Sequence, residues 1–362
     1  MHILNNVAVV QIGDSPASRY CTKLLGDFCA DVTVVDVPGD LAAARSDDDA
    51  SWSRREAMRV YLDADKGERR GDLAELAATA DVVVRDQGAD VFGLTAAEEF
   101  AQLRARNPAA IYVVLSPFGA DGPWAGRSGD DLAMQAAGGL VAQIGRSGEK
   151  PLSVPYEIIG LTQGLHAATA VLFCLLLPEQ ARPTAPVDIA GSDAIASYSR
   201  MYTHIYTFYG WPAVRTGARA PGSGGQYPMT ILPCRDGHVV MMSRSRAEWA
   251  RYLEMMGHPA WAQDPELRDP AVIARHHADR VDAYVTDWLS TRTSSELTVL
   301  ARQYGVPLAP LRAVPEVLAD TQLAHRHFFA AAPDRPDIVL PTFPAVFTPS
   351  SGPEGDGGLH DR

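Results

Sequence analysis

The stretch ADVVVRDQGADVFGLTAAEEFAQLRARNPAAIYVVLS, residues 80–116, decides the fold class. It contains two short apolar runs, DVVVR at 81–85 and AIYVVLS at 110–116, and between them a segment over 95–107 that we expect to be a helix. Continuous apolar runs of this length are typical of strands that are buried on both faces of a sheet. A strand, a helix and a second strand predict a parallel pair joined by a right-handed crossover.

The alternation of apolar runs with helical segments continues on both sides of this stretch. NVAVVQI at 6–12 and DVTVVDV at 31–37 predict two earlier strands, and APVDIA at 185–190 predicts a later one. The long apolar run at 161–177 contains polar side chains, so we expect a buried core helix and not a membrane span. The first turn, GDSPAS at 13–18, lacks the G-x-G-x-x-G pattern, so no dinucleotide site is expected. These elements predict an α/β fold with a Rossmann-like parallel sheet.

The sequence pattern of the chain changes after about residue 200. YGWPAVRTGARAPGSGGQYP at 209–228 is dense in Gly and Pro, and MTILPCRDGHVVMMS at 229–243 predicts a hairpin with its turn at Asp236-Gly237. Three helices are expected after the hairpin, at 247–256, 276–289 and 295–304. This part of the chain is therefore predicted to be a small α+β domain.

These patterns divide the chain into five predicted parts. They are the first part of a large Rossmann-like domain (1–200), a linker (201–224), a small α+β domain (225–322), a segment that returns to the large domain (323–350) and a disordered tail (351–362).

Composition excludes several classes of function. The 362 residues are 46% hydrophobic and 21% charged, an ordinary globular balance, and the net charge of −12 argues against a nucleic-acid binder. The four cysteines form no C-x-x-C pair, which indicates a reducing compartment. The first residues show no secretory signal pattern, so we expect a cytoplasmic protein without a membrane partner. The pair His276-His277 has no further ligand at metal spacing, and no metal site is expected.

The order of these pieces resembles the family III CoA-transferases, also called the CaiB/BaiF family, which include acyl-CoA racemases. The most specific match is NPAAIYVVLSPFGADGP at 107–123, followed by an aspartate and by QAAGG at 135–139. PCRDGHVVMMS at 233–243 and YGVPLAPLRAVPEVLAD at 304–320 match the small domain and its exit. The resemblance covers roughly residues 5–348.

This resemblance implies a fold and a reaction. The fold would have a large domain built from both ends of the chain, a small domain between them, and two chains interlocked as a dimer. The reaction would move CoA from one acyl group to another carboxylate, through an aspartate that attacks the thioester and becomes an aspartyl thioester. A glycine-rich loop would limit hydrolysis of these intermediates and offer N–H donors to the oxyanion.

The family's catalytic positions are altered in this sequence. Aligned without gaps, the nucleophilic aspartate falls on Gly160, which has no side chain. Glu157 lies three residues earlier and replaces it only if the segment shifts; otherwise it is a solvated loop carboxylate. The racemase pair corresponds to Asp130-Asp131, and the racemase's small-domain glutamate to about Arg246, so racemization is not expected.

Glu157 and Asp131 are therefore the candidate catalytic groups. Asp130, Tyr156 and Gly160 are the candidate residues that line the site. Asp131 could instead be a helix cap.

The candidate residues for binding CoA or substrate also come from the resemblance. The family's N-x-x-K, whose lysine meets CoA phosphate, reads RREA here, and the arginines Arg54 and Arg55 near that position could hold the phosphate instead. Arg127 lies where a basic residue meets the nucleotide end of CoA, with a lone surface arginine as the alternative. Ala17 matches a backbone contact to CoA. RDQ at 85–87 replaces the family's ENF, which changes a wall of the CoA site. The segment PGSGGQYP matches the glycine loop through Gly222, Gly224, Gly225 and Gln226, with a plain linker as the alternative.

Three functions remain open at this point. The first is an atypical enzyme that acts on an acyl thioester, of CoA or of a carrier-protein pantetheine arm, without an aspartyl-CoA intermediate and without a tightly bound cofactor. The second is a non-catalytic partner of a related chain in a heteromer, or a binding module. The third is an ordinary CoA-transferase that uses Glu157. A homodimer and, for the carrier-protein substrate, an acyl carrier protein are the expected partners.

Overall fold

The chain forms two compact units. The computed structural model describes residues 3–35, 54–64, 66–69, 73–89, 96–212, 214–219, 226–333 and 335–347. The first unit comprises Met1–Gly138, Pro155–Ser197 and Leu318–Arg362, and the second comprises Gly139–Val154 and Tyr198–Val317. Both ends of the chain therefore belong to the first unit. The domain boundaries expected from the sequence stay predictions.

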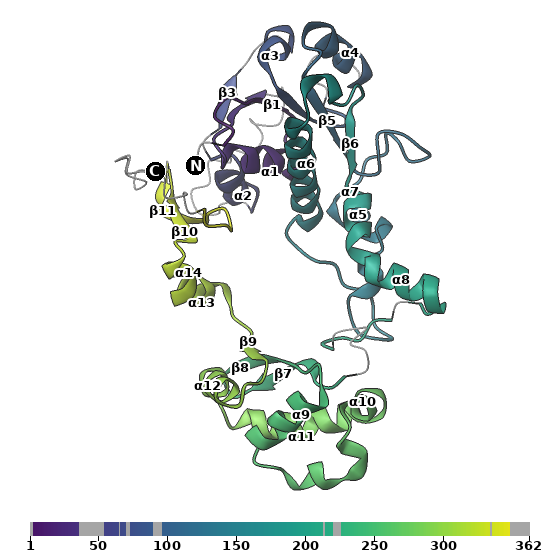
Figure 1. Ribbon diagram of the computed structural model, residues 1–362, viewed down its shortest axis with the longest axis vertical. Coiled ribbons are helices and arrows are strands. Elements are labelled where there is room, and N and C mark those ends of the chain that lie inside the picture. Colours follow the sequence, from purple (N-terminus) through teal and green to yellow (C-terminus); the bar gives the residue numbers. More distant parts are fainter. Residues whose placement is uncertain are drawn as a thin grey trace. The chain divides into compact units, whose positions relative to one another are not determined.

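A six-stranded parallel sheet forms the centre of the first unit, in the order β3-β2-β1-β4-β5-β6 (Figure 1). The strands are β1 Ala8–Ile12, β2 Asp31–Val35, β3 Gly67–Arg69, β4 Val82–Asp86, β5 Ile111–Ser116 and β6 Val187–Ala190. Because β1 pairs with both β2 and β4, the strand order reverses beside β1, which is where parallel α/β sheets usually bind ligands.

Helices connect and cover these strands. They are α1 Pro16–Gly26, α2 Arg54–Leu62, α3 Leu73–Thr79, α4 Ala96–Arg106, α5 Asp131–Ala137, α6 Ile158–Leu176 and α7 Gly191–Ala196. The returning segment adds α14 Thr321–His325 and an antiparallel pair, β10 Phe329–Ala332 and β11 Arg335–Pro341.

The sheet is buried on both faces, as its apolar runs predict. Val9 packs with residues of α1 and α6 on one face, whereas Val10 and Ile12 pack with Leu76 of α3 and Leu103 of α4 on the other. Alternate side chains of one strand point to opposite faces, so β1 contributes to both cores. The α/β class expected from the sequence is confirmed.

Helix α6 packs closely against α1 (Figure 1). Two buried glycines one turn apart, Gly160 and Gly164, lie on this contact. A Cβ atom on Gly164 would lie 2.6 Å from the carbonyl oxygen of Ala17, so only glycine permits this approach. By length and composition alone α6 could cross a membrane, and 44% of its apolar window is buried within the protein.

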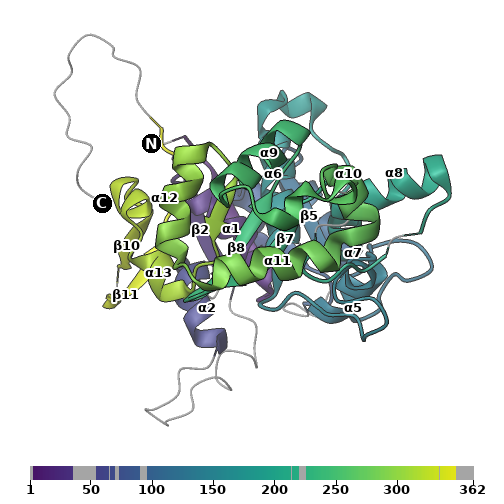
Figure 2. The same cartoon turned by 90° about the horizontal axis from the view of Figure 1, so that it is seen from below.

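The second unit is built on a three-stranded antiparallel sheet, in the order β7-β8-β9. Its strands are β7 Met229–Cys234, β8 Gly237–Met242 and β9 Leu308–Pro310. Its α-helices of five or more residues are α8 Arg200–Tyr209, α9 Arg246–Met255, α11 Ala278–Ser290, α12 Ser294–Tyr304 and α13 Val314–Leu318. The last residue of α13, Leu318, already belongs to the first unit. Figure 2 shows α9, α11 and α12 packed around β7 and β8, where Trp249, Tyr252 and Leu289 are fully buried.

Two details of this unit differ from the sequence-based expectation. Cys234 pairs with Gly237 across the hairpin, so the turn is formed by Arg235 and Asp236 and not by Asp236-Gly237. Helix α11 begins at Ala278 and not at 276, because a π-helical turn over Ile273–His277 comes before it. Neither detail changes the topology.

Candidate active site

The chain enters α6 through two residues with left-handed backbone conformation. Tyr156 has φ 72° and Glu157 has φ 54°, and both side chains are exposed. Neither residue is glycine, and each costs on the order of 1–3 kcal/mol of backbone strain. Strain of this size persists only where neighbouring contacts fix the chain, so the start of α6 is held in one conformation.

Asp131 supplies one of these contacts. It lies in the first turn of α5, and its Oδ1 accepts a hydrogen bond from the backbone N–H of Ile159 at 2.8 Å. Its Oδ2 accepts a hydrogen bond from Gln135 at 2.6 Å. Asp130 caps α5 itself, because its Oδ1 accepts from Ala133 N at 2.8 Å. Asp130, and not Asp131, is therefore the N-terminal cap of α5. Asp131 instead accepts a hydrogen bond from the first turn of α6.

Gln163 fixes α6 to the sheet one turn further on. Its buried side-chain amide donates to the carbonyl oxygens of Ser116, at 2.9 Å, and Ile189, at 2.7 Å. These two residues lie at or near the carboxyl ends of β5 and β6. The start of α6 is therefore held at the sheet edge where α/β proteins place their ligands.

Gly160 lies on the face of α6 that is turned toward α1. A Cβ atom at this position would lie 2.9 Å from Cβ of Pro16 and 3.5 Å from the backbone N of Ala17. A side chain at 160 would therefore meet α1 first. The structure gives Gly160 and Ala17 a role in helix packing, and Ala17 is itself 2% exposed.

The turn before α1 encloses a buried carboxylate. Asp86, at the end of β4, accepts hydrogen bonds from the backbone N–H of Ser15 at 2.8 Å, from the Ser15 hydroxyl at 2.6 Å and from the Ser18 hydroxyl at 2.8 Å. Burial raises the pKa of Asp86, and these hydrogen bonds offset part of that rise. A Cβ atom on Gly13 (φ 116°) would lie 2.3 Å from Asp86 Oδ2, so the turn requires glycine.

This carboxylate occupies the N-terminus of α1, where dinucleotide-binding folds hold a phosphate. The expectation that the first turn is not a dinucleotide site stays a prediction.

The remaining candidates are scattered. Arg127 is exposed, and its guanidinium carbon lies 5.5 Å from the centre of the Trp124 ring. Arg54 is the first residue of α2, but its side chain lies outside the described residues, as do Gly222, Gly224 and Gly225. Gln226 is described, in the second unit; its Oε1 is buried and accepts no hydrogen bond from the described part of the chain.

The structure thus brings part of the candidate set together. The ends of α1, α5 and α6 meet in the first unit, and they carry Ala17, Asp130, Asp131, Tyr156, Glu157 and Gly160. This arrangement sets two carboxylates, of Asp131 and Glu157, at the N-terminus of a long helix. Carboxylates in such a place can act as a base or a nucleophile, and the helix N–H groups favour developing negative charge.

Gln163 and Asp86 help to form the site, but the sequence analysis does not predict their structural role. A lone glutamine within an apolar helix is a signal for Gln163, because a buried amide must find carbonyl partners. The replacement of the family's asparagine by Asp86 was noticed, but nothing in the sequence indicated that Ser15 and Ser18 would bind it.

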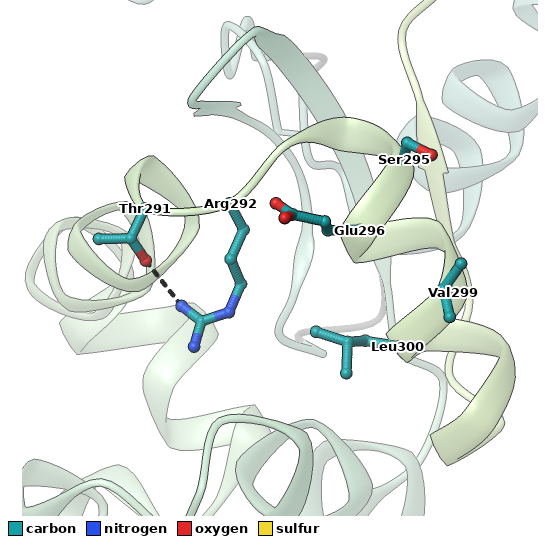
Figure 3. Close-up of a pocket in the computed structure, with 6 residues that line it drawn as sticks. All are labelled: Thr291, Arg292, Ser295, Glu296, Val299 and Leu300. Carbon is teal, nitrogen blue, oxygen red and sulfur yellow. Dashed lines mark hydrogen bonds between the residues drawn. The ribbon is translucent and has the colours of Figure 1, made fainter.

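Other features of the described residues stand apart from this site. A hollow on the second unit is lined by Thr291, Arg292, Ser295, Glu296, Val299 and Leu300 (Figure 3). In it Arg292 donates a hydrogen bond to the Thr291 hydroxyl, and none of the six is a candidate residue. The described residues contain no group of three or more His, Cys, Asp or Glu side chains that could hold a metal ion.

The fold and these motifs define a class of protein. The family model for CoA-transferase family III matches residues 4–354, and the chain belongs to this family. It is a transferase of acyl-thioester chemistry, and the resemblance seen in the sequence is confirmed.

Individual relatives share low sequence identity with this chain. The chain is 25% identical to a succinyl-CoA–D-citramalate CoA-transferase of Chloroflexus aurantiacus, over 92% of this chain and 84% of the relative. It is 27% identical to a succinyl-CoA:mesaconate CoA-transferase of Haloarcula hispanica, over 90% and 84%. A crystal structure of a CaiB/BaiF family protein from Brucella suis has the same fold, with a TM-score of 0.80 and 22% identity over 96% and 93% of the two chains.

Proposed function

We propose that this protein is an acyl-thioester transferase that works without an aspartyl-CoA intermediate at position 160. The observation that supports the proposal most directly is Gly160 itself, which has no side chain and is packed against Pro16. The proposed substrate is a thioester of CoA or of a carrier-protein pantetheine arm, with no tightly bound cofactor. Because two relatives are named for succinyl-CoA, succinyl-CoA is the first donor to test.

Direct transfer between two bound substrates gives the same products as the family's reaction, without an acyl group covalently bound to the enzyme. The carboxylate of the acceptor attacks the thioester carbonyl and expels the CoA thiolate, which leaves a mixed anhydride of the two acids. The thiolate then attacks the acceptor's carbonyl carbon in that anhydride and releases the donor acid. The enzyme contributes proximity and stabilisation of the two oxyanions.

The start of α6 is suited to that contribution. Its dipole favours negative charge, and Asp131, which accepts the hydrogen bond of the Ile159 N–H, holds the first turn in place. In the first unit, the proposed role of Asp131 and Glu157 is to orient the reactants, and Asp130, Tyr156 and Gly160 are proposed to border the space. In the second unit, the residues proposed to bind the acyl thioester are Gln226, Gly222, Gly224 and Gly225. Arg54 and Arg127 bind phosphate groups of CoA, and Ala17 contributes a backbone contact.

An isotope experiment tests the absence of an enzyme acyl group. In direct transfer from succinyl-CoA to an ¹⁸O-labelled dicarboxylate, one label enters the released succinate and none enters the protein. In a route through an aspartyl or glutamyl thioester, the label enters that side chain. Peptide mass mapping of the protein after turnover, with and without hydroxylamine trapping, distinguishes the two. A labelled or trapped Glu157 would restore the ordinary transferase, and a labelled Asp131 would make that residue the nucleophile.

The protein is proposed to act as an interlocked homodimer. Apolar side chains are exposed on α6, among them Phe173 and Leu176, and on α8, among them Tyr206 and Phe208. Exposed apolar patches of this kind mark protein interfaces. Light scattering of the protein expressed alone should give the mass of a dimer; a stable monomer at micromolar concentration would contradict the proposal.

A second candidate function is a subunit that pairs with a related chain. A relative 26% identical over 90% of this chain is named the alpha subunit of a succinyl-CoA–L-malate CoA-transferase. If this function holds, the protein alone should show no transfer with any acyl thioester. Transfer should appear on co-expression with a family member that carries the aspartate.

A further inference from the structure

The two flanks of the glycine-rich segment are bound to one carboxylate. The chain is described up to Arg219 and again from Gln226. Arg219 Nη2 donates to Oδ2 of Asp282 at 2.5 Å, and the hydroxyl of Tyr227 donates to Oδ1 of the same residue at 2.8 Å. Each oxygen of Asp282, in α11, therefore holds a different end of the segment.

The surroundings make these bonds strong. The side chain of Asp282 is 16% exposed, and Tyr227 is fully buried with its ring edge-on to Trp249 at 5.1 Å. Burial and the neighbouring carboxylate raise the pKa of Tyr227, so its hydroxyl stays a neutral donor. Hydrogen bonds to a charged, partly buried acceptor are stronger than neutral ones in water.

Tyr227 is adjacent to Gln226, the described candidate for substrate binding. Gln226 Oε1 is buried and has no hydrogen-bond partner among the described residues. Buried acceptors are rarely left without a donor, so this oxygen calls for a donor beyond the described residues, and we take an amide N–H of a pantetheine arm as the donor to test.

We propose that Asp282 is a positioning residue for acyl-thioester binding: by holding Arg219 and Tyr227 together, it fixes the place of the Gln226 side-chain carbonyl. This inference rests on the proposed function, in which Gln226 binds the acyl thioester. It assigns Asp282 no contact with the substrate.

A carboxylate is required because it accepts from both flanks at once. Asp282→Asn keeps one acceptor oxygen and turns an NH2 group toward one of the donors, so one flank is released. Asp282→Glu keeps two acceptor oxygens. Asp279→Asn is the matched control, because Asp279 also accepts from Arg219 Nη2, at 2.5 Å, but is 93% exposed and does not touch Tyr227.

The experiment measures the Kd of succinyl-CoA and of CoA by calorimetry on the full-length protein. Asp282→Asn should raise the Kd on the order of tenfold, the equivalent of one lost hydrogen bond. Tyr227→Phe should raise it by a similar factor, whereas Asp282→Glu and Asp279→Asn should stay within about threefold of wild type. Urea unfolding of each variant shows that the fold is retained.

A double-mutant cycle separates the two proposals. Gln226→Ala should raise the Kd, and Asp282→Asn should add nothing further in that background, because Asp282 acts through Gln226. If Gln226→Ala raises the Kd and Asp282→Asn does not, or if the two effects add, the positioning role is wrong and the proposed function stands. If Gln226→Ala leaves the Kd unchanged, the binding role of this segment fails, and the positioning role fails with it.

Discussion

The carboxylate of Asp131 accepts a hydrogen bond from the backbone N–H of Ile159, 2.8 Å away, and so joins the first turn of α5 to the first turn of α6. The contact spans 28 residues of sequence and places a negative charge at the N-terminus of α6. Stability and activity can be separated at this position, because an amide keeps the acceptor and loses the charge.

We expect Asp131→Ala to lower the free energy of unfolding by about 1 kcal/mol, the usual loss when a helix N-terminal N–H loses its side-chain acceptor. Asp131→Asn should retain most of that stability. If the charge orients a reactant, both variants should lose transferase activity. Asp320→Ala is the control, since it removes a comparable cap, that of α14, at a residue outside the proposed site. Full activity in Asp131→Asn would limit Asp131 to capping.

The two glycines on the α1–α6 contact should differ in how well they tolerate an added side chain. A Cβ atom at Gly164 meets a backbone oxygen at 2.6 Å, whereas one at Gly160 meets the Pro16 side chain at 2.9 Å. Gly164→Ala should cost roughly 1–3 kcal/mol, and Gly160→Ala less, because the nearest contact at 160 is longer and is made to a side chain. Alanine's higher helix propensity offsets part of the strain at both positions. Chemical denaturation measures both.

Gly160→Asp should be the more damaging change at position 160, because a carboxylate would be pressed against Pro16. It should lower both stability and transferase activity. Gly237→Ala is the control, since no atom lies within 4 Å of its added Cβ. An unchanged stability of Gly160→Asp would show that position 160 does not face α1.

Lys66 gives the first unit a pH dependence. Its ammonium donates to the carbonyl oxygen of Arg19 at 2.8 Å and to Gln11 Oε1 at 3.1 Å, and burial lowers the pKa of Lys66 to about 8. Below pH 8 the folded protein bears the full cost of a buried charge, and that cost is relieved as the pH rises toward the unfolded value near 10.5.

Between pH 7 and pH 10, wild type should therefore gain roughly 2 kcal/mol of stability relative to Lys66→Met. Urea titrations of both proteins across this range measure the difference at each pH, which cancels the titration of other groups. The burial of a titrating Lys66 would be contradicted if the stability difference between wild type and Lys66→Met stayed constant with pH, or if the variant became relatively more stable as the pH rose.

A buried ion pair anchors the end of β4. Arg85 Nε donates to Glu99 Oε2 at 2.7 Å, the Tyr112 hydroxyl donates to Glu99 Oε1 at 2.9 Å, and all three residues are buried. Glu99→Gln leaves the Arg85 charge without its counter-ion and should cost about 3–5 kcal/mol. Tyr112→Phe removes one hydrogen bond and should cost about 1 kcal/mol. Similar losses in the two variants, measured by denaturant unfolding, would show that the charge of Glu99 is not needed.

The strands of the parallel sheet could be read from the sequence because burial on both faces leaves an uninterrupted apolar run. β5, Ile111–Ser116, lies within the predicted 110–116, and β4 and β6 were also found to within two residues. β3, Gly67–Arg69, was missed: a three-residue edge strand takes its conformation from pairing with β2, and carries no pattern of its own.

The candidate site was less accessible to sequence reasoning. The resemblance located Asp131 and Gly160, but the bond between Asp131 and Ile159 depends on how α5 and α6 meet. Likewise, the direction in which Gly160 faces follows from the packing of α6 on α1. Asp282 could not be found, because its two partners lie 55 and 63 residues away along the chain.

The Asp86 carboxylate has a consequence for how the protein recognises a nucleotide. The turn before α1 carries a built-in hydrogen-bond acceptor, so its conformation is complete before any ligand arrives, and no binding energy is spent on ordering it. The same carboxyl oxygens already occupy the Ser15 and Ser18 donors that a diphosphate would need at this point of the sheet edge. Attraction of a nucleotide must then come from positive side chains elsewhere, such as the exposed Arg127, whose attraction weakens as counter-ions accumulate. Affinity for CoA should accordingly fall with ionic strength more steeply than affinity for a pantetheine thioester that lacks the nucleotide.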